Sequence, residues 1–338
     1  KTEAPEVILL SDNCSDLPCL QILQSIINNP FSPPVIIISE NDDLSFVILA
    51  VKNGAHYFLR KPLNIEKLKK TVVKALQNYA GVRNTFHTER EVPELAKIVG
   101  RSEKMRKMKH SIQKYAQSPF PVLILGESGT GKELIARAIH ALSPRKEGPF
   151  IARNCGAIPS TLIQSELFGS EKGAFTDATS KPGSFELANN GSLFLDEIGE
   201  MDTLAQVHLL RVLESEELVR LGGVRKIPLN VRFITATNKN LQEAIYNKEF
   251  RKDLYYMINT LVLPVPPLRE RKTDIPVLAQ YFARSDGQNH HVLSTGSIQK
   301  LAEYPWPGNV RELKSTVQRA SLHTETEMIE PKHILFNQ

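Results

Sequence analysis

The stretch Pro121-Val-Leu-Ile-Leu-Gly-Glu-Ser-Gly-Thr-Gly-Lys-Glu133 decides how this sequence can fold. Its apolar run, Val122 to Leu125, predicts a buried strand, and the apolar spacing from Glu133 to Leu142 predicts a helix. The glycines between strand and helix let backbone N–H groups converge on a phosphate at the helix N-terminus. A glycine-rich turn with an exposed lysine is the alternative, but the flanking strand and helix favour nucleotide binding.

The loop has the spacing G-x-x-x-x-G-K, in which the lysine reaches the outer phosphates of a nucleotide. The Ser or Thr that usually follows the lysine is replaced by glutamate here. We therefore predict a nucleotide-binding loop composed of Gly126, Glu127, Ser128, Gly129, Thr130, Gly131, Lys132 and Glu133.

Length and composition bound the class of protein. A chain of 338 residues predicts two or three domains, and 41% hydrophobic with 23% charged residues is typical of a soluble globular protein. The net charge of +5 neither demands nor excludes nucleic acid as a partner. An odd count of three cysteines argues against a disulfide framework and fits a reducing cytoplasm. No apolar run approaches a membrane span, so we expect no membrane partner.

The N-terminal segment alternates strand and helix signals, which predicts a parallel sheet. Strands are expected at residues 7–10, 35–38 and 56–59, and helices at residues 17–27, 44–52 and 65–79.

Polar side chains end two further strands of the central segment. The run at 191–198 contains Asp196 and Glu197, and such a pair at the tip of a parallel strand holds magnesium and activates the attacking water in P-loop enzymes. We therefore predict ATP and Mg²⁺ as ligands, with Asp196 on the metal. The run at 231–238 ends in Asn238, which is either a water-positioning group or a turn residue.

Together these motifs resemble the central ATPase domain of bacterial sigma-54-dependent transcriptional activators, the NtrC-like enhancer-binding proteins of the AAA+ superfamily. The resemblance covers roughly residues 98 to 338. Besides the loop, it rests on Glu-Leu-Phe-Gly at 166–169, Gly-Ala-Phe-Thr-Asp-Ala at 173–178, Leu-Phe-Leu-Asp-Glu-Ile at 193–198, Pro-Pro-Leu-Arg-Glu-Arg at 266–271 and Trp-Pro-Gly-Asn-Val-Arg-Glu-Leu at 306–313.

The resemblance implies an α/β fold: a P-loop AAA+ domain, with a parallel sheet and helices on both faces, plus a small α-helical lid. A partial, flavodoxin-like receiver remnant precedes it. The expected boundaries are 1–80 for the receiver-like domain, 81–97 for a linker, 98–269 for the ATPase subdomain and 270–338 for the lid. The chain stops where relatives continue into a helix-turn-helix domain, so we expect DNA contact only through such a domain, which is absent here.

The ending Gly54-Ala-His-Tyr-Phe-Leu-Arg-Lys-Pro62 resembles the last strand and Lys-Pro turn of a response-regulator receiver. The position of the phosphorylated aspartate aligns with Ser11, which cannot form an acyl phosphate. Asp12 is one residue further along, and in a strand it would point to the opposite face. We interpret the segment as a degenerate remnant that is not phosphorylated; whether it signals or only caps the next domain stays open.

By the resemblance, the predicted loop binds ATP, and Asp196 and Glu197 form the Walker B pair. Asn154 matches the residue that couples Glu197 to the remodelling loops. Thr237 and Asn238 occupy the sensor I position. Arg311 matches the sensor II arginine that contacts nucleotide from the lid; without the resemblance it would pass for a solvated helical charge.

The resemblance also implies that Phe175 and Thr176 lie on a surface loop that contacts sigma-54. An exposed phenylalanine is costly without a partner, so a contact role is physically reasonable, although Phe175 could instead pack into its own domain. Asp177 replaces the second glycine of the family's motif, which restricts the backbone and adds a charge. We expect the loop to work because Phe175 and Thr176 remain.

Members of the family usually carry two arginines, six residues apart, that reach the ATP of the neighbouring subunit. Here Arg251 is kept, but Met257 stands at the second position. A thioether cannot neutralise phosphoryl charge, and a missing arginine finger costs about 10³ to 10⁵ in rate.

The leading hypothesis is an ATPase ring, a hexamer or heptamer, that remodels the sigma-54 RNA polymerase for promoter opening, with turnover that Met257 in place of the second arginine could impair. Its catalytic residues would be Glu197, Asp196, Lys132, Arg251 and Asn154. The alternative is an ATP-binding oligomerisation or regulatory module with little turnover.

Overall fold

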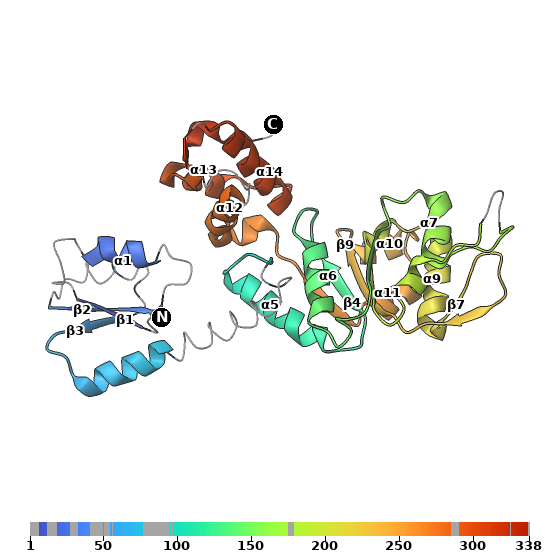
Figure 1. Ribbon diagram of the computed structural model, residues 1–338, viewed down its shortest axis with the longest axis horizontal. Helices are drawn as coiled ribbons and strands as arrows, with labels where there is room; N and C mark the ends of the chain where they lie inside the picture. The colour runs from blue at the N-terminus through green and yellow to red at the C-terminus, as the bar shows by residue number, and fades with distance from the viewer. Residues whose placement is uncertain are drawn as a thin grey trace. The chain divides into compact units, whose positions relative to one another are not determined.

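The structure is a computed structural model that describes residues 7–11, 19–27, 33–40, 50, 55, 57–76, 95, 97–174, 179–284, 291–324 and 326–336. The chain divides into two compact units, Lys1–Glu91 and Val92–Gln338, each with its own hydrophobic clusters (Figure 1). Among the helices described, none is both long and apolar enough to span a bilayer.

The first unit is a three-stranded parallel sheet in the order β1-β2-β3, with helices packed against it. Alternate residues of β2 enter different clusters: Val35 and Ile37 one, Ile36 and Ile38 the other. The expected strands and helices form, apart from the helix at 44–52, of which only Ala50 is among the described residues. The elements are β1 (Ile8–Ser11), α1 (Cys19–Ile27), β2 (Val35–Ser39), β3 (Tyr57–Arg60) and a helix over 65–76.

The second unit is built on a five-stranded sheet, in which every pair of neighbours is parallel. The strand order β10-β4-β9-β6-β5 places the strand before the glycine loop at an inner position. In that order the strands are β10 (Leu261–Pro264), β4 (Val122–Leu125), β9 (Arg232–Thr237), β6 (Ser192–Asp196) and β5 (Phe150–Asn154).

Both faces of this sheet are covered, as the near-continuous apolar runs of its strands require. Val122, Ile124 and Phe194 enter a cluster with α5 and α6 on one face, whereas Leu123 and Leu195 enter a cluster with α7 and α9 on the other. The predicted parallel sheet with helices on both faces is confirmed. The covering helices are α5 (Glu103–Ala116), α6 (Lys132–Ala141), α7 (Ser160–Phe168) and α9 (Thr203–Ser215).

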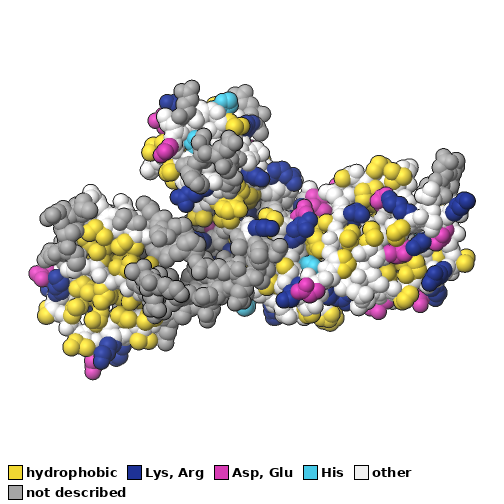
Figure 2. All heavy atoms as spheres, viewed as in Figure 1, with side chains coloured by type: hydrophobic (Ala, Val, Ile, Leu, Met, Phe, Trp, Pro, Cys, Tyr) yellow, Lys and Arg dark blue, Asp and Glu magenta, His cyan; other side chains and the backbone are white. Residues whose placement is uncertain are grey.

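Smaller elements complete the α/β part of this unit. They are α8 (Ser184–Leu187), η1 (Ile198–Glu200), the antiparallel pair β7 (Glu217–Val219) and β8 (Lys226–Pro228), α10 (Leu241–Tyr246) and α11 (Lys252–Ile258). On the face seen in Figure 2, basic, acidic and hydrophobic side chains are interspersed over this part, as the mild net charge leads one to expect.

The lid is a helical subdomain around the buried Trp306, whose indole N–H donates to the carbonyl of Leu301 at 2.8 Å. Its helices and strands are α12 (Ile275–Arg284), β11 (Val292–Leu293), α13 (Thr295–Glu303), α14 (Asn309–Leu322), β12 (Met328–Ile329) and η4 (Pro331–His333). The short helices η2 (Leu268–Glu270) and η3 (Lys272–Asp274) connect it to the sheet.

A buried carboxylate ties this connection to the segment that precedes α5. Asp274 is fully buried, and it accepts hydrogen bonds from the backbone N–H groups of Arg101 at 2.6 Å and Ser102 at 2.8 Å. The hydroxyl of Ser102 also donates to it at 2.6 Å. Three donors compensate for the desolvation of the charge, so this carboxylate holds two segments about 170 residues apart in sequence.

Replacing Asp274 by alanine should lower the free energy of unfolding by about 3 kcal/mol, because hydrogen bonds to a charge are lost and buried donors are left unpaired. Urea denaturation followed by circular dichroism would measure the change. Glu303→Ala is the control, since among the described residues its exposed carboxylate accepts one hydrogen bond, from Gln299 at 3.1 Å, and its removal should change the free energy of unfolding by less than about 0.5 kcal/mol. Equal effects of the two variants would contradict the assigned role of Asp274.

Candidate functional site

The carboxyl ends of β4, β9 and β6 meet at one edge of the sheet, because neighbouring parallel strands end on the same side. Gly126 follows β4, Asn238 follows β9, and Asp196 ends β6 and is followed by Glu197. The structure therefore brings the predicted glycine loop, the acidic pair and Asn238 together.

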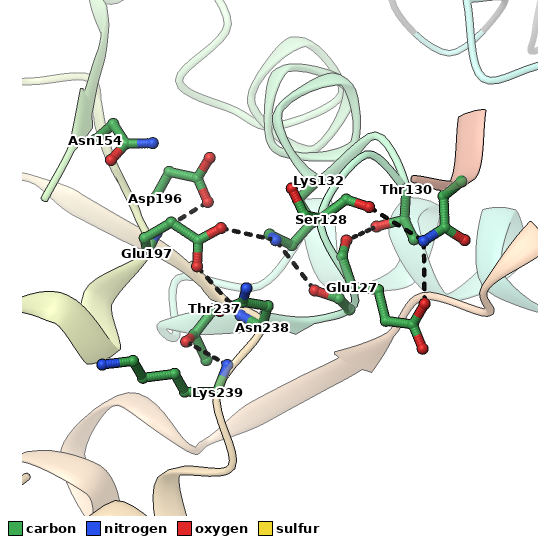
Figure 3. Close-up of polar contacts among 12 residues, drawn as sticks. Glu127, Ser128, Thr130, Lys132, Asn154, Asp196, Glu197, Thr237, Asn238 and Lys239 are labelled. Carbon is green, nitrogen blue, oxygen red and sulfur yellow. Dashed lines mark hydrogen bonds and ion pairs between the residues drawn. The ribbon is translucent and has the colours of Figure 1, made fainter. Parts of the chain in front are cut away.

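Lys132 is the centre of this edge (Figure 3). Its side chain is 6% exposed, and its ammonium donates to the carbonyl of Gly126 at 3.0 Å and to Oε1 of Glu197 at 3.2 Å. The other oxygen of Glu197 accepts from the backbone N–H of Asn238 at 3.3 Å. One carboxylate thus connects the loop lysine with the end of β9.

Glu197 adopts a left-handed backbone conformation, with φ 50° and ψ 48°, which costs energy in a residue other than glycine. This geometry directs its side chain toward Lys132 and Asn238 (Figure 3). Strain of this kind persists only where the surrounding contacts over-determine it, and here both carboxylate oxygens have partners.

Asp196 is a half-buried carboxylate beside this pair. Burial raises its pKa above the usual value, while the charge of Lys132 and a hydrogen bond from the N–H of Glu197, at 2.9 Å, act in the opposite direction. A carboxylate that gains from a nearby cation suits Mg²⁺, which prefers oxygen ligands, so the residue present fits the predicted metal.

The backbone of the loop leaves room for a phosphate at the N-terminus of α6. Gly131 has φ 100°, and a Cβ added there would meet nothing within 4 Å. Gly129 has φ 77°, and its neighbour is the lid: an added Cβ would lie 2.3 Å from the carbonyl oxygen of Gly308. Both positions favour glycine, the first for its backbone and the second also for the close approach.

The lid reaches the loop through the start of α14. The guanidinium of Arg311 donates to the hydroxyl of Ser128 at 3.1 Å, and its backbone N–H donates to the carbonyl of Gly129 at 3.2 Å. Arg311 thus lies at the predicted loop, as the sequence interpretation of this residue requires.

Glu127 faces the lid and the segment of η2 and η3 that leads into it, called the lid linker below, rather than Lys132. Its carboxylate accepts from the guanidinium of Arg269 at 2.7 and 2.5 Å and from the side-chain amide of Asn309 at 3.0 Å. The hydrogen bonds from Arg269 and then Asn309 lower the pKa of Glu127 to about 2. Glu127 is therefore ionised at any physiological pH.

Other predicted site residues have partners elsewhere. Arg251, at the start of α11, forms an ion pair with Asp253 at 2.6 Å, and within the described part of the chain no hydrogen bond or ion pair joins it to the loop. Glu133 forms an exposed ion pair with Arg137 at 2.7 Å.

Asn154 is the register partner of Asp196 on β5, and its side-chain oxygen accepts from the N–H of Ala157 at 3.0 Å. Thr130 closes the loop by donating to the carbonyl of Glu127 at 2.7 Å. Phe175 and Thr176 lie outside the described residues.

Two residues at the site carried no role in the sequence interpretation: Arg269 and Asn309. Both belong to motifs by which the family resemblance was recognised, so the signal was present. Their contacts with Glu127 span 142 and 182 residues, however, and no local pattern indicates such a pairing.

The sheet order, the glycine loop before α6, the acidic strand end and the helical lid define this unit as a P-loop domain of the AAA+ class. The sequence profile described as the Sigma-54 interaction domain matches residues 98–264, and that of the AAA+ ATPase lid domain matches residues 269–337.

Whole-chain relatives agree with these matches. The DNA-binding transcriptional regulator NtrC of Proteus hauseri is 39% identical over 338 residues, which cover 98% of this chain and 72% of NtrC. NtrC of Escherichia coli K12 is 40% identical over 320 residues, covering 93% of this chain and 68% of NtrC. The crystal structure of NtrX from Brucella abortus in complex with ATP has a TM-score of 0.65 at 31% identity, covering 98% of this chain and 74% of NtrX.

The chain therefore belongs to the NtrC-like family of sigma-54-dependent transcriptional regulators. The predicted resemblance and fold class are confirmed, and the comparisons do not favour the alternative of an ATP-binding module with little turnover.

Asp196→Asn should stabilise the free chain at neutral pH. Because burial raises the pKa of Asp196 in the folded state, the folded chain binds this proton more tightly than the unfolded chain, and stability is lost as pH rises from the unfolded toward the folded pKa. Asparagine removes that loss and still accepts from the N–H of Glu197. Thermal unfolding at pH 7 without divalent cations would test this expectation.

The control for this experiment is Glu303→Gln, an exposed side chain whose oxygen still accepts from Gln299, and it should melt as the parent does. A lower melting temperature for Asp196→Asn than for the parent would contradict the role of burial at Asp196.

Proposed function

We propose that this chain binds and hydrolyses ATP and couples hydrolysis to remodelling of the sigma-54 RNA polymerase. The single observation that carries the proposal is the 3.2 Å contact between the ammonium of Lys132 and Glu197, at the edge where three parallel strands end. The lysine of a phosphate-binding loop and a carboxylate suited to activating water are then adjacent, which is what attack on a terminal phosphate requires.

Within this proposal, the backbone N–H groups from Gly126 to Gly131 and the N-terminus of α6 hold the phosphates. Lys132 neutralises the outer phosphates, and Arg311 reaches them from the lid. Bound Mg²⁺, held through Asp196, would supply further neutralisation of phosphate charge.

Glu197 would orient and polarise the attacking water. Its second oxygen is held by the N–H of Asn238 at 3.3 Å, which fixes the carboxylate with respect to the end of β9. The side chain of Asn238 is exposed and free to contact water or phosphate. Asn154, opposite Asp196 in the register of β5 and β6, would report changes at this pair to the loops that follow β5.

The partners in this proposal are further copies of the chain and the sigma-54 polymerase, in the cytoplasm. A ring would let Arg251 of one subunit serve the ATP of the next. Phe175 and Thr176 would contact sigma-54. Domain boundaries at 1–80, 81–97, 98–269 and 270–338 fit this division of labour.

One observation favours a second candidate, an ATP-binding assembly module with little turnover. Arg251 is paired with Asp253 of its own helix at 2.6 Å, and Met257 carries no charge. The ion pair is exposed, so its free energy is small and a neighbouring triphosphate would outcompete it. We therefore retain hydrolysis as the function.

Lys132→Ala should weaken ATP binding by at least tenfold, because the cation at the outer phosphates is removed, and should abolish hydrolysis. Titration with a fluorescent ATP analogue would measure the affinity. The control is Lys114→Ala, an exposed lysine of α5, which should bind as the parent does. Unchanged affinity in Lys132→Ala would remove the basis of the proposed site.

Arg251→Ala should reduce kcat by about 10³ or more while ATP affinity changes little, since a finger acts on the transition state. Met257→Arg should raise kcat by less than about tenfold if Arg251 suffices. Steady-state hydrolysis by the assembled protein would decide. A parent without turnover and a gain of several hundredfold in Met257→Arg would support the assembly module instead.

A further inference from the structure

Asn309 stands out among the polar residues of the second unit because it is fully buried and has a left-handed backbone, with φ 52°. It is the first residue of α14, directly after Gly308. Asparagine tolerates this conformation better than most residues, but a fully buried amide needs partners for its oxygen and its nitrogen.

The side chain of Asn309 finds these partners on two other segments. Its oxygen accepts from the backbone N–H of Leu268, the first residue of η2 in the lid linker, at 2.8 Å. Its nitrogen donates to the carbonyl of Ser128 at 3.1 Å and to the carboxylate of Glu127 at 3.0 Å. One side-chain amide thus joins the first turn of α14, the lid linker and the phosphate loop.

Glu127 is an unusual group for a loop that receives phosphates, because an uncompensated carboxylate would repel them. The structure compensates it from outside the loop, through the guanidinium of Arg269 and the amide of Asn309. Both contacts direct the carboxylate of Glu127 toward the lid linker and the lid. The pair with Arg269 is about half exposed and therefore screened by water, whereas the amide of Asn309 is fully buried.

The backbone shows the same close fit between lid and loop. A Cβ on Gly129 would lie 2.3 Å from the carbonyl oxygen of Gly308, and the N–H of Arg311 donates to the carbonyl of Gly129. The position of Arg311 therefore follows from the seating of residues 308 and 309 on the loop.

We propose that Asn309 is a positioning residue that seats the lid on the phosphate loop and keeps Glu127 directed away from bound phosphates. It acts through Glu127, Ser128 and Leu268, and by seating the start of α14 it sets where Arg311 meets the nucleotide. The inference rests on the proposed function for the identity of the ligand, but the seating itself belongs to the chain without nucleotide.

Asn309→Asp tests this directly, because aspartate has nearly the same shape and also tolerates the left-handed backbone. Its carboxylate still accepts from Leu268, but it loses both donors and faces Glu127 with a second negative charge. ATP affinity of the full chain should fall about tenfold to hundredfold, the range expected when hydrogen bonds to a charge are replaced by repulsion.

The matched control is Asn190→Asp. Asn190 also has a left-handed backbone, with φ 61°, but it is exposed, and its side-chain oxygen accepts from Asn230 at 3.1 Å, a bond that aspartate keeps. This variant should bind ATP as the parent does.

A second substitution distinguishes positioning from general destabilisation. In the double variant Asn309→Asp/Glu127→Gln, the amide of residue 127 can donate to the new carboxylate, which restores one bond with reversed polarity and removes the repulsion. ATP affinity should recover at least fivefold relative to Asn309→Asp, although Glu127→Gln alone weakens the contact with Arg269. If Asn309→Asp only destabilised the lid, a second substitution that weakens the contact between residue 127 and Arg269 would not restore ATP affinity.

Hydrogen exchange of the nucleotide-free protein gives a readout that does not depend on ATP. Asn309→Asp should raise exchange of backbone amides in residues 126–131 and leave that of β5 and β6 unchanged. If urea denaturation shows no cooperative unfolding transition for Asn309→Asp, that variant is not folded. Asn309→Gly, which also tolerates the left-handed backbone, then replaces it in the measurements of ATP affinity and hydrogen exchange.

The outcomes separate this inference from the proposed function. If the parent and Asn190→Asp fail to bind ATP, the proposed function fails, and exchange in the loop still decides whether Asn309 seats the lid. Parent-like affinity and exchange in Asn309→Asp, or no recovery in the double variant, overturns the inference.

Discussion

The parallel pairing of β4 with β9, and of β9 with β6, is the constraint on which the site depends. Parallel strands end on the same side of a sheet, so residues that follow three different strands arrive at one edge. Gly126, Asn238 and Asp196 are far apart in sequence, but the backbone of the sheet alone brings them to the same edge. The 3.2 Å contact of Lys132 with Glu197 is a consequence of this arrangement.

The same edge concentrates groups that folding alone would avoid. The side chain of Lys132 is 6% exposed, and that of Glu197 is 19% exposed with a strained backbone. Desolvating such a pair offsets much of its attraction. Asp196, whose pKa is raised by burial, adds a further cost that a bound cation would relieve. These features are typical of a site kept ready for a highly charged ligand at the expense of stability in its absence.

Local patterns predicted much of this, and their limits are physical. The strands at 122–125 and 192–196 and the loop between β4 and α6 follow from apolar runs and glycine spacing, which are local properties. The acidic pair was predicted because strand ends gather polar groups. The partners of Glu127 were not, because Arg269 and Asn309 lie 142 and 182 residues further along the chain and only the tertiary fold brings them to it. The pairing of Arg251 with Asp253 likewise depends on side-chain rotamers, which no sequence spacing determines.

Asp274 has a mechanical consequence as well. Asp274 ends η3, where the lid linker meets the lid. It binds the backbone N–H groups of Arg101 and Ser102, which directly precede α5. A force on the segment before α5 would therefore reach the start of the lid through these hydrogen bonds, without first passing through the sheet. Along the chain, Ser102 and Asp274 are separated by the whole α/β part of the unit. Through space, a single carboxylate connects them.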